Sequence, residues 1–185
     1  MSELYAAVGM VEFTSIAAGI DGADRMIKSA RVQPIFFKTI CPGKFVAAVT
    51  GDVASVTSAV AAARERHPDT VVDWFVIANI HPEVVQGLAG VCPATDRKAL
   101  GIIETFSAIS VVMAADAAVK AANVHLVDVR IALALGGKGY ILLTGDVTAC
   151  EAAVEAGGAA VARLGLLVGK IVIANPSEEI FAQLG

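Results

Sequence analysis

The sequence has few aromatic residues, few charged residues and no long hydrophobic run. Aromatic residues make up 5% and charged residues 17% of its 185 residues. The longest run without a charged residue is Val84–Thr95, which Pro93 interrupts, whereas a helix that spans a bilayer needs roughly 18 apolar residues or more. We therefore expect no membrane partner, although hydrophobic residues reach 56% and the mean hydropathy is +0.71. This surplus is mostly alanine and valine, and it favours burial of further surface against other subunits.

Positive charge is scarce and scattered. The net charge is −4 and no cluster of lysine and arginine occurs, so we predict no nucleic-acid partner, because phosphates require concentrated positive charge. The three cysteines, Cys41, Cys92 and Cys150, are an odd number at no disulfide-like spacing. The N-terminal sequence also has no basic region followed by an apolar core. Together these features predict a cytoplasmic protein with reduced thiols.

Familiar catalytic motifs are also missing from the sequence. His67, His81 and His125 form no closely spaced pair of metal ligands, and neither a G-x-S-x-G nor an H-E-x-x-H motif occurs. The segment Gly136–Gly139 faintly resembles a phosphate-binding loop, but no Ser or Thr follows its lysine. We therefore expect a protein that is not an enzyme.

The chain contains an internal repeat. Residues 7–12, AVGMVE, recur as ALGIIE at residues 99–104, which makes Glu12 and Glu104 equivalent and favours an architectural role for both. Later matches keep the same order: 23–28 with 115–120, 50–53 with 144–147, and 77–79 with 173–175. Ordered matches over the whole length indicate a tandem duplication. We predict two domains, residues 1–94 and 95–185.

Each copy has the order β-α-β-β-α-β, which is typical of a ferredoxin-like α+β fold with an antiparallel sheet and helices on one face. In the first copy we expect strands at 6–14, 32–39, 44–50 and 71–79, helices at 15–30 and 52–66, and a short helix at 82–88. In the second copy we expect helices at 107–122 and 146–164, and strands at 125–134, 138–145 and 166–174.

A cysteine lies at the turn between two of the predicted strands. Pro42 followed by Gly43 suits the central positions of a type II turn, because Pro fixes φ and Gly accepts a positive φ. Cys41 precedes this pair, and Lys38 and Lys44 lie on its two sides. A lone cysteine is usually a small buried hydrophobe, so a thiol at an exposed hairpin tip beside lysines is unusual.

An aspartate–lysine pair recurs on the first helix of each copy. Asp24 and Lys28, and their equivalents Asp116 and Lys120, are four residues apart, which is the spacing of a local ion pair on a helix. Their retention in both copies suggests that Lys28 and Lys120 also serve an equivalent surface in each half.

These motifs resemble the bacterial microcompartment shell domain. The resemblance rests on Gly-x-x-Glu in the first strand, Ala-Asp-x-x-x-Lys before the second strand and Gly-Asp-Val at the second helix, each present twice. The chain is thus similar to tandem-domain shell proteins over nearly its whole length. This resemblance implies a structural shell tile: a pseudo-hexagonal homotrimer that packs beside other shell proteins in the microcompartment shell, with Lys28 and Lys120 at the tile edges.

The same resemblance implies a central pore surrounded by hairpin turns. The implied pore-lining residues are Lys38, Thr39, Ile40, Pro42, Gly43 and Lys44 in the first copy, and Gly136, Gly137 and Lys138 in the second. The second turn has no thiol.

Residues 38–45 and Ile77–Pro82 narrow the resemblance to tandem shell proteins of propanediol-utilisation compartments, whose pore turns hold a 4Fe–4S cluster. One cysteine cannot hold such a cluster, which needs about four ligands, but three copies of Cys41 around a threefold axis could supply three thiolates. We therefore expect one 4Fe–4S cluster per trimer for electron transfer across the shell, with a redox enzyme as electron partner. Lys38 and Lys44 would lower the thiol pKa and offset the charge of the cluster. Cys92 and Cys150 are interpreted as structural.

Two alternatives remain open from the sequence. The tile could have a cluster-free metabolite pore, whose lysines attract anionic substrates. The chain could instead be a ferredoxin-like regulator that senses a small molecule through its glycine turns, which would require a ligand pocket between subunits.

Overall fold

The computed structural model describes residues 6–92, 98–107, 109–131 and 136–184. The chain divides into two compact units, Met1–Val85 and Gln86–Gly185. The predicted domain boundary between residues 94 and 95 lies outside the described residues and stays a prediction. In the part of the chain that the structure describes, no helix is long and apolar enough to cross a membrane.

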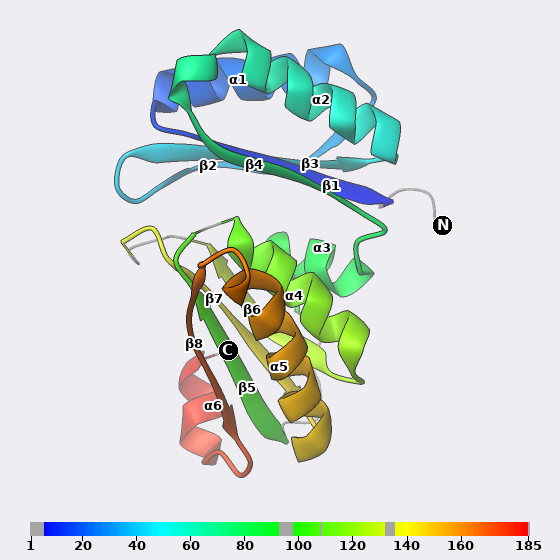
Figure 1. Ribbon diagram of the computed structural model, residues 1–185, viewed down its shortest axis with the longest axis vertical. Helices are drawn as coiled ribbons and strands as arrows, with labels where there is room; N and C mark the ends of the chain where they lie inside the picture. Colours follow the sequence, from blue (N-terminus) through cyan, green and yellow to red (C-terminus); the bar gives the residue numbers. More distant parts are fainter. Residues whose placement is uncertain (1–5, 93–97, 108, 132–135, 185) are drawn as a thin grey trace. The chain divides into compact units, whose positions relative to one another are not determined.

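The first unit is a four-stranded antiparallel sheet with two helices on one face (Figure 1). The strand order is β2-β3-β1-β4, which is the ferredoxin-like order, and it confirms the predicted fold class. The elements are β1 (Ala7–Phe13), α1 (Ile16–Ser29), β2 (Gln33–Ile40), β3 (Lys44–Gly51), α2 (Val53–Arg66), a 3₁₀ turn (Pro68–Thr70) and β4 (Val71–Ala78). The short helix α3 (Pro82–Leu88) follows, and the division between the two units falls within it.

The second unit repeats this arrangement with the strand order β6-β7-β5-β8. Its elements are β5 (Ala99–Thr105), α4 (Ser110–Ala121), β6 (His125–Ile131), β7 (Gly139–Gly145), α5 (Val147–Ala162), β8 (Leu167–Ile173) and α6 (Glu178–Leu184). The predicted strand 125–134 is thus described as far as Ile131, and residues 132–135 lie outside the described residues.

The helices begin where short polar side chains satisfy free backbone N–H groups. The Ser15 hydroxyl accepts a hydrogen bond from the Ala18 N–H at 3.3 Å, and the Asp52 carboxylate accepts one from the Ser55 N–H at 2.8 Å. At α4 the Ser107 hydroxyl accepts from the Ser110 N–H at 3.2 Å. Helix α4 begins at Ser110, three residues after the predicted start.

The first core lies between the sheet and helices α1 and α2. Alternate residues of β1 and β3 point toward these helices, because side chains alternate between the faces of a strand. The cluster consists of Val11, Phe13, Ala23, Met26, Phe45, Ala47, Val49, Ala59, Val60 and Ala63. Glu12 and Lys44 have the opposite alternation and therefore lie on the face of the sheet that carries no helix of this pair.

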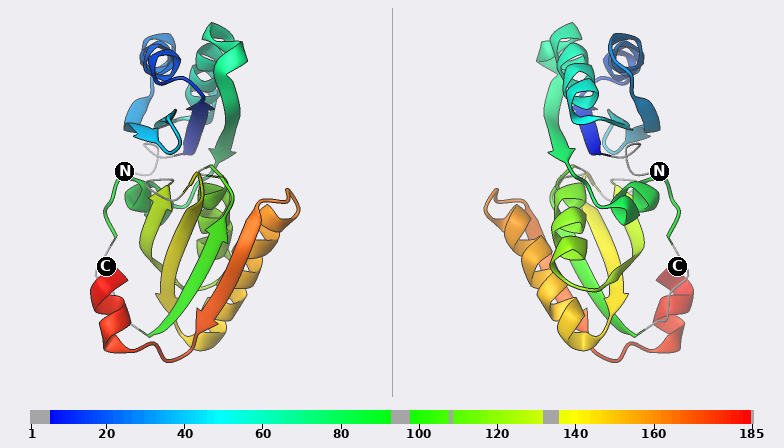
Figure 2. Two further views of the ribbon diagram at one scale, coloured as in Figure 1. Left: turned by 90° about the vertical axis from the view of Figure 1, so that its left-hand side faces the viewer. Right: turned by 90° about the vertical axis from the view of Figure 1, so that its right-hand side faces the viewer.

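The sequence prediction missed α6. This helix places Phe181, which is 4% exposed, against Leu100 and Leu142 on the face of the second sheet opposite α4 and α5 (Figure 2). Helix α6 is the repeat equivalent of α3, since both follow the matched Ile-Ala-Asn segments by the same number of residues. That match was the available signal for α6.

Candidate functional site

The candidate site is the hairpin tip between β2 and β3. Ile40 pairs with Lys44, and Cys41, Pro42 and Gly43 connect them. Ile40 is buried, whereas Cys41 is exposed. Gly43 has a φ of +68°, as predicted for this turn, and the Cys41–Pro42 peptide bond is cis, which the sequence prediction did not include. A Cβ added at Gly43 would meet no heavy atom within 4 Å. The tip therefore leaves the Cys41 side chain exposed, with open space at Gly43.

Lys44 is held by an acidic residue in the neighbouring strand. Its Nζ lies 2.8 Å from Glu12 Oε1, and the Glu12 side chain is only 4% exposed. The pair joins the foot of the hairpin to β1, the strand next to β3 in the sheet. The sequence prediction did not include this ion pair, and the effect of Lys44 on the charge at the thiol stays a prediction. Glu12 thus has the architectural role that its repeat position predicted.

Lys38 contacts an aromatic ring on its own strand. Its ammonium nitrogen lies 4.1 Å from the centre of the Phe36 ring, which is within the range of a cation–π contact. Phe36 and Lys38 are two residues apart in β2, so their side chains lie on the same face of the strand. Lys38 pairs with Val46, further along the hairpin from the tip than Lys44.

The second hairpin turn has the same ion pair without a thiol. Gly136 and Gly137 have φ angles of +61° and +91°, which favour glycine. Lys138 Nζ lies 3.0 Å from Glu104 Oε1, with side chains 43% and 41% exposed. The preceding residue, Leu135, lies outside the described residues. The two repeats therefore share the lysine–glutamate pair but differ in its burial and in the turn itself.

The other two cysteines differ from Cys41 in their surroundings. Cys150 lies in α5 and is fully buried, and its sulfur lies 3.7 Å from the Ala99 carbonyl oxygen. Burial, and secondarily the charge of Asp146, raises the pKa of the Cys150 thiol. Cys92 is half-buried. In the described part of the chain, Cys41 is thus the exposed thiol.

The lysines predicted at tile edges both form local ion pairs. Lys28 Nζ lies 2.6 Å from Asp24 Oδ2 on α1, and Lys120 Nζ lies 2.6 Å from Asp116 Oδ2 on α4. The first pair is well exposed, while the Asp116 side chain is only 11% exposed. Their role at a tile edge stays a prediction.

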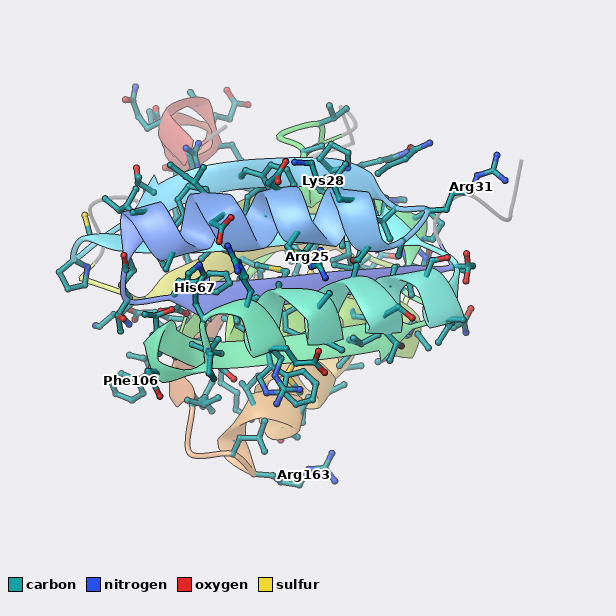
Figure 3. The ribbon with its side chains drawn as sticks, turned by 90° about the horizontal axis from the view of Figure 1, so that it is seen from above. Arg25, Lys28, Arg31, His67, Phe106 and Arg163 are labelled. Carbon is teal, nitrogen blue, oxygen red and sulfur yellow. The ribbon has the colours of Figure 1, made fainter. Side chains whose placement is uncertain are left out.

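A shallow polar depression lies between α1 and α2, where Figure 3 shows Arg25 and His67. Asp21 accepts hydrogen bonds at 2.7 Å from Arg66 Nε and lies 2.7 Å from His67 Nε2. The bond from Arg66, followed by that with His67, lowers the pKa of the Asp21 carboxyl. The depression lies on the helices of the first unit and is lined mainly by paired charges.

Within one chain, no group of three His, Cys, Asp or Glu side chains among the described residues is suited to hold a metal ion. Cys41 alone supplies one soft ligand at an open tip. Soft thiolate ligands suit iron–sulfur clusters, so the donor fits a cluster only if other chains contribute the remaining thiolates.

The two units have the same fold and equivalent hairpins, so the chain consists of two copies of one domain. The BMC domain model matches residues 7–80 and 99–176. The chain belongs to this family and is a tandem-domain shell protein of a bacterial microcompartment, as the sequence predicted.

Several relatives resemble one or both copies. The chain is 42% identical over 178 residues to the bacterial microcompartment shell protein PduT of Citrobacter freundii, which covers 96% of this chain and 97% of that protein. It is 46% identical over 87 residues to the shell protein EutM of Salmonella typhimurium, over 45% of this chain and 88% of EutM. A crystal structure of a microcompartment protein from Desulfitobacterium hafniense has a TM-score of 0.91 and 44% identity, covering 94% of this chain and 97% of that one. PduT and EutM carry the names of shell proteins, in agreement with a structural role.

Proposed function

We propose that three copies of this chain form a pseudo-hexagonal shell tile whose central pore holds a 4Fe–4S cluster through Cys41 of each copy. The observation that carries the proposal is the exposed thiol at an open hairpin tip, present in one of the two repeats. Rotation about a threefold axis gathers identical tips. Three thiolates then leave one iron for water or another small ligand.

The cluster would supply one-electron chemistry, and this chain would supply the ligands and the surrounding charge. Lys38 and Lys44, which lie on the two sides of the turn, would offset part of the negative charge of the cluster. The electron would pass from a redox enzyme on one side of the shell to an acceptor on the other. A pore closed by a cluster at its narrowest point would conduct electrons in place of metabolites.

The ion pairs argue against the cluster-free metabolite pore. That alternative uses lysines at the opening to attract anionic substrates, but Lys44 and Lys138 are both paired with glutamates. The regulator alternative loses its basis, since both copies match the shell-domain family.

The cluster is tested by iron and sulfide analysis of protein purified without oxygen. We expect about four iron atoms and about four sulfides per three chains, with the brown colour of such clusters. Cys41→Ser should lose iron and colour and keep the oligomeric mass. Cys92→Ser is the matched control and should keep both. Iron-free wild-type protein would favour the metabolite pore, and iron retained in Cys41→Ser would remove Cys41 from the site.

The tile itself is tested by light scattering. We expect a species of three times the chain mass of 18.9 kDa. A wild-type protein that stays monomeric at micromolar concentrations would refute both the trimer and the shared cluster.

A further inference from the structure

Charged residues follow an order on the face of the first sheet opposite α1 and α2. Directly opposed residues of an antiparallel sheet lie on one face, as do alternate residues of a strand. Lys38 opposes Val46, Val46 opposes Glu12, and Glu12 opposes Asp73 in β4. Lys44 is two residues before Val46 in β3 and lies nearer the hairpin tip. The charge on this face therefore changes from positive at the tip to negative in β1 and β4.

Lys44 is the charged residue whose backbone lies nearest the thiol in the pairing of this hairpin. It directly opposes Ile40, the residue before Cys41, and Cα atoms of opposed residues are about 5 Å apart. Glu12 lies further from the tip, at the position of Val46. The pair therefore has its positive member closer to Cys41 than its negative member.

Glu12 controls where the charge of Lys44 is held. The lysine Nζ lies 2.8 Å from Glu12 Oε1, so the side chain reaches across to β1. A lysine ammonium group has three donors on a flexible stem. Without the carboxylate, this group would be able to turn toward the nearest other negative charge. Glu12 thus both balances the charge of Lys44 and restrains its position.

The second copy has only part of this arrangement. Lys138 and Glu104 form the equivalent ion pair, with Nζ and Oε1 3.0 Å apart. The residue opposite Glu104 in β8 is Gly169, where the first copy has Asp73. The additional carboxylate therefore occurs in the copy whose hairpin turn has the cysteine.

We propose that the Glu12–Lys44 pair sets the reduction potential of the cluster at Cys41, with Glu12 as the positioning residue. The inference rests on the proposed cluster and deepens it. Reduction adds one electron to the cluster and makes or breaks no bond, so a nearby positive charge favours the reduced state and a negative charge disfavours it. Glu12 limits the positive charge that Lys44 brings to the tip, and it thereby keeps the potential low.

The test compares two variants of the full chain, purified without oxygen. Glu12→Gln removes the negative charge and keeps the length and an acceptor oxygen of the side chain, so it leaves the charge of Lys44 unbalanced. We expect a more positive potential, with the ratio of reduced to oxidised cluster raised about tenfold at a fixed potential, as for one unit charge near a partly solvated centre. A tenfold change equals about 59 mV for a one-electron couple.

The second variant, Glu12→Gln/Lys44→Met, removes both charges. Because Lys44 lies nearer the tip than Glu12, the potential should fall from that of Glu12→Gln to the wild-type value or below it. A redox titration followed by visible absorbance measures all three proteins, and iron is counted in each. A merely structural role of Glu12 would lower the iron content and leave the potential of the remaining cluster unchanged.

Asp24→Asn is the matched control, because it makes the same change of charge in the same unit. It releases Lys28 on α1, which packs on the other face of the sheet. Both side chains are more than half exposed, at 67% for Lys28 and 53% for Asp24, so water and salt screen their charges. We expect the wild-type potential.

The outcomes separate this inference from the proposed function. A wild-type protein without iron would refute the proposed cluster, and the inference with it. A wild-type protein with its cluster, beside a Glu12→Gln variant whose potential is unchanged or more negative, would overturn the inference alone. So would loss of the cluster from Glu12→Gln, or an equal shift in Asp24→Asn.

Discussion

The two lysine–glutamate pairs allow one substitution to be compared at two equivalent positions. Lys44→Met removes the partner of Glu12, whose side chain is 4% exposed, while Lys138→Met removes the partner of Glu104, whose side chain is 41% exposed. Methionine keeps most of the apolar length of lysine, so packing of the stem is largely preserved. The comparison therefore isolates the cost of leaving a carboxylate without its partner.

The expected costs differ because of burial. Removing one member of a buried ion pair leaves an uncompensated charge and costs about 3 kcal/mol or more. An ion pair open to solvent contributes about 1 kcal/mol or less. We expect Lys44→Met to lower the free energy of unfolding by about 3 kcal/mol, which is the lower end of the buried range because Lys44 itself is 27% exposed. Lys138→Met should lower it by less than about 1 kcal/mol.

Urea unfolding of both variants at one protein concentration measures this difference, since association shifts apparent stability by mass action. The double variant Glu12→Gln/Lys44→Met removes the unpaired charge and should recover most of the loss. Equal midpoints for Lys44→Met and Lys138→Met would refute the reasoning. So would a double variant that is no more stable than Lys44→Met.

Three further outcomes are expected. Gly19→Ala should destabilise the first unit by about 1–3 kcal/mol in urea unfolding, because the added Cβ would lie 2.5 Å from Phe45; unchanged stability would mean that the helix shifts freely. The lowered pKa of Asp21 means that its contribution to stability is present above the unfolded-state pKa and is lost as the pH falls through the folded-state pKa. The midpoint temperature of thermal unfolding should therefore decline less between about pH 5 and about pH 2 in Asp21→Asn than in the wild type. Parallel plots of this midpoint against pH would contradict the prediction. In cluster-free native protein, iodoacetamide should label Cys41 well before Cys150, whose thiol is buried and has a raised pKa; mass spectrometry of the peptides reports the order.

The sequence was sufficient to predict the repeat, the order of the strands and main helices in each copy, and the hairpin at Cys41, because each depends on local patterns. Ser15 and Asp52 begin helices as their side chains predicted, since capping is a local interaction. The contact between Lys44 and Glu12 was not predicted from the sequence. It depends on pairing between β1 and β3, which are far apart in the sequence, and on how deeply each copy buries the pair.

Helix α6 was missed because its few residues carry little periodicity. The match between the two Ile-Ala-Asn segments was the signal that could have predicted it.

Joining the two domains in one polypeptide has a consequence for stoichiometry. A ring built from six identical single-domain subunits must repeat every side chain six times around its centre. In the fused chain, one turn can keep Cys-Pro-Gly while the other has Gly-Gly, so the proposed ring of three chains would present three sulfur atoms. Duplication thereby lets evolution set the ligand count of the centre independently of the size of the tile.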